Sequence, residues 1–217
     1  MAEAEASWVG NLEFTLSQSL DNHPLGRAIR HLWLLQPAMD FLNHGSFGAT
    51  PRRVLARQSE IRCEMERQPL RFFNDKIIPG LREAAEDLGE LVGARGEDIA
   101  FVDNATTGAN AVLRSFPLES GDEVLITNHS YGAVTRTVEY VTQRSGASLV
   151  TAELPFPGIT LDACVRALEE AISPKTRLVV LDHITSATGL IFPIQALVDL
   201  CRERGVPVLV DGAHGPG

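Results

Sequence analysis

Asp211 and His214 have the side chains best suited to chemistry near the end of this chain. They follow an apolar run in "VPVLVDGAHGPG". A carboxylate that ends a buried strand is costly unless a cation or a strong donor meets it. A protonated pyridine nitrogen would serve as that cation, and so would a metal ion with His214 as a second ligand. The glycine spacing is G-x-x-G-x-G rather than G-x-G-x-x-G and Pro216 lacks an amide donor, so we set a dinucleotide loop aside.

Polar and aromatic side chains also follow three other apolar runs that we predict to be strands. These side chains are Asn104 to Thr107 after "DIAFVD", His129 and Tyr131 after "DEVLITN", and His183, Thr185 and Ser186 after "LVVLD". In an open parallel sheet, ligands bind outside the carboxyl ends of the strands. The sequence therefore predicts one ligand site built from four loops.

Each of these groups also has a purely structural interpretation. Thr106 and Thr107 in "NATTGAN" open a predicted helix, where backbone N–H groups and the helix dipole favour a phosphate, but ordinary N-capping would use the same residues. Tyr131 could stack on a planar ligand or cover the sheet edge. Thr185 and Ser186 suit hydrogen bonds to a ligand and equally suit a turn. The convergence of the four loops favours the ligand site.

The elements that must position these residues alternate along the chain. Strands are predicted at 98–103, 122–128, 147–154, 177–184 and 206–211, and helices at 106–116, 131–145, 161–172 and 194–205. Earlier helices are predicted at about 25–35, at 51–68 with Thr50 as the N-cap, and at 80–92 before Gly93. This rhythm indicates an α/β fold with a mostly parallel sheet covered by helices on both faces.

Composition excludes several classes of partner. The net charge is −9, and no run of lysine and arginine occurs, so neither nucleic acid nor a membrane is an expected partner. No apolar run approaches the roughly 20 residues that span a bilayer. The first residues, "MAEAEASWVGN", lack the apolar core of a secretory signal. We therefore expect a cytoplasmic protein.

Five motifs in order resemble the class V aminotransferase family of pyridoxal-phosphate (PLP) enzymes, in the branch with isopenicillin N epimerase and, more distantly, cysteine desulfurases. The motifs are "FLNHGSFGATP", "NATTGAN", "NHSYGA", "DHITSATG" and "VDGAHGPG". The resemblance implies the large domain of the PLP-dependent transferase fold type I, incomplete at the C-terminus. Residues 1–40 would then be an arm and helix, and residues 41–217 the N-terminal part of the PLP-binding domain.

The resemblance also implies roles for individual residues. Ala105, Thr106 and Thr107 match the phosphate-binding turn, and Tyr131 matches the ring that stacks on the cofactor. Thr185 and Ser186 match the segment near the cofactor's 3-oxygen. Asp211 matches the carboxylate that pairs with the pyridinium nitrogen, and His214 matches the residue beside the ring oxygen. Substrate contacts are implied for Asn43, His44, Gly45 and Arg71.

The implied reaction starts from an amino-acid substrate, which forms an external aldimine and then loses its α-proton, as in an epimerase or a lyase. The family's Schiff-base lysine lies beyond the "VDGAH" motif, and neither Lys76 nor Lys175 matches it. We therefore expect a truncated chain that has no catalytic lysine and is inactive alone, from an enzyme that forms a homodimer. The alternatives are a non-catalytic degenerate subunit and a metal-dependent hydrolase using Asp211 and His214.

Overall fold

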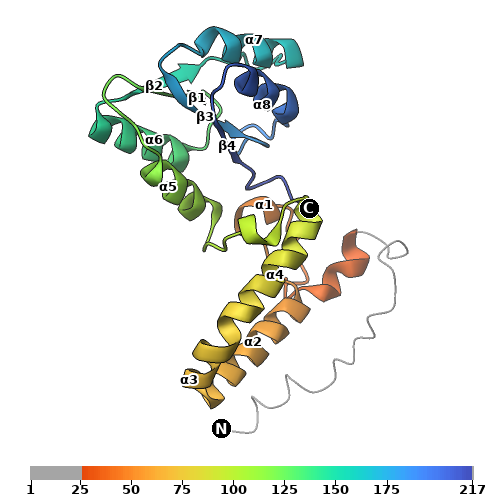
Figure 1. Ribbon diagram of the computed structural model, residues 1–217. Helices are drawn as coiled ribbons and strands as arrows, with labels where there is room; N and C mark the ends of the chain where they lie inside the picture. Colours follow the sequence, from red (N-terminus) through yellow and green to blue (C-terminus); the bar gives the residue numbers. More distant parts are fainter. Residues whose placement is uncertain (1–25, 217) are drawn as a thin grey trace. The chain divides into compact units, whose positions relative to one another are not determined.

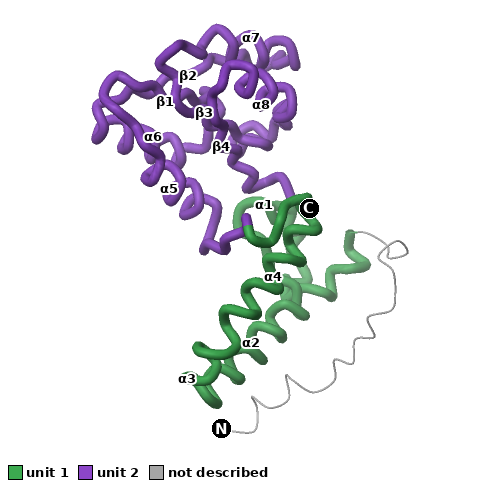
Figure 2. The backbone as a smooth tube through the Cα atoms, in the orientation of Figure 1, with its two compact units in different colours: residues 1–97 green, residues 98–217 purple. Residues whose placement is uncertain are grey.

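The structure is a computed structural model that describes residues 26–216 in two compact units (Figure 2). The first unit runs to Glu97 and the second from Asp98. The predicted division into an arm and helix over 1–40 and part of a PLP-binding domain over 41–217 stays a prediction, and residues 1–25 lie outside the described residues.

Helices make up the first unit (Figure 1). The order is η3 (Gly26–Leu32), α1 (His44–Phe47), α2 (Arg52–Arg67), α3 (Pro69–Arg71), η4 (Phe72–Lys76), α4 (Ile77–Val92) and η5 (Gly96–Asp98), which crosses the boundary by one residue. The predicted end of α4 is confirmed, because Gly93 has a φ of 71° and donates its N–H to the Gly89 carbonyl. Only Ala85 and Gly89 are buried among the described residues of this unit.

The second unit contains a four-stranded parallel sheet. Its strands are β1 (Glu123–Thr127), β2 (Ser148–Ala152), β3 (Thr176–Asp182) and β4 (Val208–Asp211), in the spatial order β2-β1-β3-β4. The helices α5 (Ala105–Ser115), α6 (Gly132–Ser145), α7 (Leu161–Ala171) and α8 (Ile194–Glu203) lie on its two faces (Figure 1). Within the described residues, β2 and β4 are therefore the outermost strands. The predicted α/β class with a parallel sheet is confirmed.

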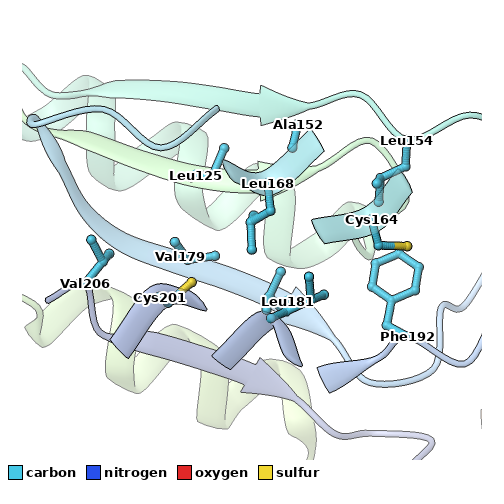
Figure 3. Close-up of a cluster of buried hydrophobic side chains, with 11 residues drawn as sticks. Leu125, Ala152, Leu154, Cys164, Leu168, Val179, Leu181, Phe192, Cys201 and Val206 are labelled. Atoms are coloured by element: carbon cyan, nitrogen blue, oxygen red, sulfur yellow. The ribbon is translucent and has the colours of Figure 1, made fainter. Parts of the chain in front are cut away.

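Alternation along the strands divides the core into two layers. Leu125 of β1 and Val179 and Leu181 of β3 pack beneath α7 and α8, in the cluster that Figure 3 shows. The next residues along, including Val124 and Val180, pack against α5 and α6 instead. Because successive side chains of a strand point to opposite faces, Asp182 falls on the α5 and α6 face. By the same alternation from Leu209, Asp211 falls on that face too.

Three local predictions differ from the structure. Residues 99–103 do not form a strand, because no described strand pairs with them, and Phe101 and Val102 are about half exposed. An apolar run without a hydrogen-bonding neighbour has no ladder to join. The helix α2 begins at Arg52 with Pro51 as its N-cap, so Thr50 does not cap it. The predicted first helix, 25–35, is a 3₁₀ helix over Gly26–Leu32, and Leu25 lies outside the described residues.

Replacing Leu125 with alanine should lower the free energy of unfolding by about 2–5 kcal/mol, because the side chain is fully buried and its removal leaves a cavity. Leu161→Ala is the matched control, because Leu161 is 54% exposed, and it should cost less than about 1 kcal/mol. Urea denaturation followed by circular dichroism measures both. Equal losses would contradict the two-layer core.

Candidate active site

Two carboxylates meet at the carboxyl edge of the sheet. Asp182 ends β3, Asp211 ends β4, and the two residues are register partners in the parallel ladder. Neighbouring strands lie about 4.8 Å apart, and both side chains fall on the α5 and α6 face. The edge therefore concentrates negative charge where a parallel sheet offers a ligand site.

Asp182 is the more buried member of this pair, at 4% exposure. Burial raises the pKa of its carboxyl to about 6, and the charge of Asp211 adds to the rise. Hydrogen bonds from the Ser130 side chain and the Tyr131 N–H, together with the nearby His214, act in the opposite direction. The Tyr131 N–H lies 3.2 Å from Asp182 Oδ1. A cation bound between the two carboxylates would remove the repulsion between them.

The N-terminus of α5 lies on the same face of the sheet. Asn104, rather than Thr106 or Thr107, is the N-cap, and its Oδ1 accepts the Thr107 N–H at 2.8 Å. Gly108 donates its N–H to the Asn104 carbonyl. The N–H groups of Ala105 and Thr106 have no acceptor within the helix, as expected of a first turn. These two donors and the dipole form a cradle for an anion.

The start of α6 presents Tyr131 at the same edge. Tyr131 is the N-cap residue of the helix, and its side chain is 42% exposed while its N–H is held by Asp182. His129 packs instead against Phe156 and Phe192. Its buried Nε2 has no hydrogen-bond partner among the described residues, so this nitrogen is open to a ligand or to water.

Thr185 serves the turn that follows β3. It is buried, accepts the Leu190 N–H at 2.9 Å and lies 2.7 Å from the Thr188 hydroxyl. Thr188 in turn contacts His129 Nδ1 at 3.3 Å. Ser186 is exposed in this turn. The structural interpretation therefore accounts for Thr185, while the exposed hydroxyl of Ser186 is accessible to a ligand.

A tight turn after β4 carries His214. Asp211 Oδ1 accepts the Ala213 N–H at 3.1 Å, and Gly215 donates its N–H to the Gly212 carbonyl. A Cβ at Gly215 would lie 2.5 Å from Nδ1 of His183, so only glycine lets the turn approach that ring. The His183 N–H also donates to the Asp211 carbonyl. The His183 ring thus packs directly against the turn that holds Asp211 and His214.

The predicted substrate residues lie in the first unit. Asn43 caps α1 through a hydrogen bond from the Ser46 N–H, and His44 and Gly45 open that helix. Arg71 forms an exposed ion pair with Asp75 at 3.7 Å. Their part in substrate binding stays a prediction. The eight predicted cofactor residues all lie in the second unit, in loops, at helix N-termini or, for Asp211, at the end of a strand.

Neither lysine belongs to this edge of the second unit. Lys175 directly precedes β3, whereas Asp182 ends it, so the strand's seven residues separate them by about 20 Å. Lys76 lies in the first unit and pairs with Glu64.

Among residues 26–216, no group of three or more His, Cys, Asp or Glu is arranged to hold a metal ion. None of the helices in that range has the length and apolarity to span a bilayer.

Sequence reasoning missed Asp182 as a site residue and Asn104 as the N-cap of α5. Asp182 stands inside "RLVVLDHI", which was predicted to continue as a strand to Ile184. The strand ends two residues earlier, at the acid. An aspartate that closes an apolar run is the same signal that singled out Asp211. For Asn104, its place three residues before Thr107 is the spacing of a capping residue.

Comparison with known proteins identifies the family. Aminotransferase class-V matches residues 49–217, and the chain belongs to this family. "Probable L-cysteine desulfhydrase, chloroplastic" of Arabidopsis thaliana is 36% identical over 81% of this chain and 40% of the relative. The isopenicillin N epimerase of Amycolatopsis lactamdurans is 37% identical over 84% of this chain and 46% of the relative. The chain thus spans less than half the length of these relatives.

Solved structures agree with the fold. A lysine-to-alanine variant of C-DES, with glycine covalently linked to its PLP cofactor, matches with a TM-score of 0.76 and 25% identity, over 86% of this chain and 50% of that one. The cysteine desulfurase CsdA from Escherichia coli matches with a TM-score of 0.70 and 21% identity, over 87% and 50%. The predicted resemblance to class V enzymes is therefore confirmed, and the relatives include the predicted isopenicillin N epimerase.

The raised pKa of Asp182 predicts a pH dependence of stability. The folded state holds this proton up to about pH 6, whereas the ordinary value is 3.8, so its stabilising effect is complete below about pH 4 and is lost as the pH rises through 6. Relative to Asp182→Asn, the wild-type chain should lose about 2–3 kcal/mol of unfolding free energy across this window, because each unit of pKa difference corresponds to about 1.4 kcal/mol.

Urea denaturation of both proteins between pH 4.5 and 7.5 measures this difference. Asp162→Asn on α7, an exposed carboxylate, is the control and should track the wild type. If the wild-type and Asp182→Asn curves stayed parallel over the whole range, Asp182 would not be a buried proton-holding group.

Proposed function

We propose that this chain binds PLP at the carboxyl edge of the β1–β3–β4 strands and belongs to an enzyme that removes the α-proton of an amino acid, in a lyase-like or epimerase-like reaction. One observation carries the proposal. The adjacent carboxylates of Asp182 and Asp211 share a sheet face with the N-termini of α5 and α6. The edge therefore places two carboxylates, which can bind a cation, close to a helix N-terminus, which can bind an anion.

The residues present fit the two charged ends of PLP. Its phosphate matches the free N–H groups of Ala105 and Thr106 at the N-terminus of α5, with the Thr106 and Thr107 hydroxyls beside them. Its ring nitrogen, when protonated, is the cation that the Asp211 carboxylate requires. The exposed ring of Tyr131 would cover the face of the pyridine, and Ser186 and His214 lie in the loops beside it.

When bound, PLP supplies an electron sink for the charge left by α-proton removal. Asp211 keeps the proton on the ring nitrogen, which is the condition for that chemistry. Asp182 fixes the start of α6 through the Tyr131 N–H and so orients the aromatic ring. Thr185 and Thr188 hold the 185–190 turn through their hydroxyl pair at 2.7 Å. These roles are binding and positioning. The amine of Lys175 lies at the other end of β3 and does not reach this edge.

The relatives support the reaction class. An epimerase and a desulfhydrase are both similar to this chain at more than 35% identity. Epimerisation reprotonates the α-carbon on its other face, whereas a lyase expels a β-substituent, and both start from the same proton loss. Within the same proposal, Asn43, His44, Gly45 and Arg71 contact the amino-acid substrate. A homodimer is proposed for the whole enzyme.

The cofactor analogue 4′-deoxypyridoxine 5′-phosphate tests the proposal, because it lacks the aldehyde and cannot react with Lys76 or Lys175. It should bind the chain, and Asp211→Asn should weaken binding by about ten- to hundredfold through loss of the charge-assisted hydrogen bond to the ring nitrogen. Isothermal titration calorimetry at pH 7.5 measures both affinities.

A charge control on α7 and an analogue without the phosphate complete the test. Asp162→Asn removes an equal charge from α7 and should leave the affinity unchanged. The same analogue without its phosphate should bind at least about tenfold more weakly if the α5 N-terminus is the cradle. Equal binding by the wild type and Asp211→Asn would overturn the assignment of Asp211.

A further inference from the structure

A cavity of about 350 Å³ lies between the C-terminal halves of α5 and α6. Leu113, Phe116 and Val141 form apolar parts of its wall, and Arg114, Tyr140 and Arg144 bring polar groups to it. α5 begins at the proposed PLP site and runs for 11 residues, or about 16 Å, toward this cavity. The cavity is therefore separate from the edge that holds Asp182 and Asp211.

Tyr140 holds the two guanidinium groups in place. Arg144 donates from Nη1 to the Tyr140 hydroxyl at 3.1 Å. The Arg114 guanidinium lies 4.8 Å from the centre of the Tyr140 ring, a cation–π distance, and its Nε donates to Asn110 Oδ1 at 3.2 Å. One aromatic ring and one amide thus orient two positive charges beside an apolar wall.

Neither arginine has a carboxylate partner within 4 Å among residues 26–216. Other arginines of the second unit do, as Arg202 with Asp199 and Arg204 with Glu169 illustrate. The remaining N–H groups of Arg114 and Arg144 are free to donate. The pKa of Tyr140 is lowered, chiefly by Arg144 and further by Arg114, as expected of a positive local potential.

The helix ends oppose an anion here, but less strongly. Both arginines lie in the last turns of their helices, where each dipole amounts to about half a negative charge. Two full positive charges outweigh two such half-charges. Arginines at helix ends would also stabilise the helices without any ligand, so a test must separate the two roles.

We propose that this cavity binds a small carboxylate carried on a flat apolar body. The free guanidinium N–H groups can donate to the two oxygens of a carboxylate in forked geometry. The apolar wall takes up the body of the ligand, and the Tyr140 O–H is left to donate to it. This site is independent of the PLP proposal, because it uses different residues at the other end of α5.

Benzoate is the probe, followed by the methyl NMR signals of Leu113 and Val141 in the intact chain. Benzoate should shift both signals in a saturable manner, and the neutral isostere benzamide should not. Arg114→Gln and Arg144→Gln should each weaken benzoate binding at least about tenfold. Arg136→Gln, an exposed arginine of α6 outside the cavity, is the matched control and should change it less than about twofold.

A Tyr140 variant, melting temperatures and a phosphate control distinguish ligand binding from a purely structural role of the arginines. Tyr140→Phe retains the ring and its contact with Arg114 but removes the hydroxyl that orients Arg144, so it should weaken benzoate binding while the melting temperature stays near that of the wild type. If the arginine variants lower the melting temperature but benzoate binds none of the proteins, the arginines serve only the helix ends and the proposal is wrong. Binding of inorganic phosphate as tightly as benzoate would also overturn the requirement for an apolar body.

Discussion

The placement of Asp182 beside Asp211 is the constraint on which the site depends. Two like charges on adjacent strands repel each other, and burial makes the charged form of Asp182 costlier still. The fold tolerates the pair because the Tyr131 N–H and the Ser130 side chain bond one carboxylate, while the turn after β4 bonds the other. The arrangement is least favourable when the edge is empty and the pH is neutral, which is the condition under which a bound cation contributes most.

The register of the sheet keeps the two carboxylates side by side on one face and so forms the site. A shift of β4 by one residue against β3 would send Asp211 to the opposite face, beneath α8, and separate the two carboxylates. The apolar alternation of both strands prevents that shift, because Val208 and Leu209 must enter different core layers. The same packing therefore fixes both the stability of the second unit and the position of its charged groups.

Much of this was accessible from the sequence, for identifiable reasons. The helices α5 to α8 and the strands β1 to β4 follow from apolar periodicity, and Asp211 stands out because an acid that closes an apolar strand demands an explanation. Asp182 carries the same signal, but it was missed because the strand was predicted to continue to Ile184, and its pairing with Asp211 is set by strand order, which sequence spacing does not encode. The strand predicted at 98–103 failed for the same reason, since its apolar residues have no ladder among the described strands. The capping role of Asn104 was overlooked because two threonines follow it at equally plausible capping positions.

The position of β4 at the outer side of the described sheet has a consequence for how the site is maintained. One side of β4 bonds to β3, and its other row of N–H and C=O groups faces away from the described strands. Such a row is a template to which a further extended segment can add. Amide hydrogen exchange along β4 would be slowed by any such addition. Because Asp211 belongs to this strand, a segment that adds to β4 would also restrict the backbone that carries the acid.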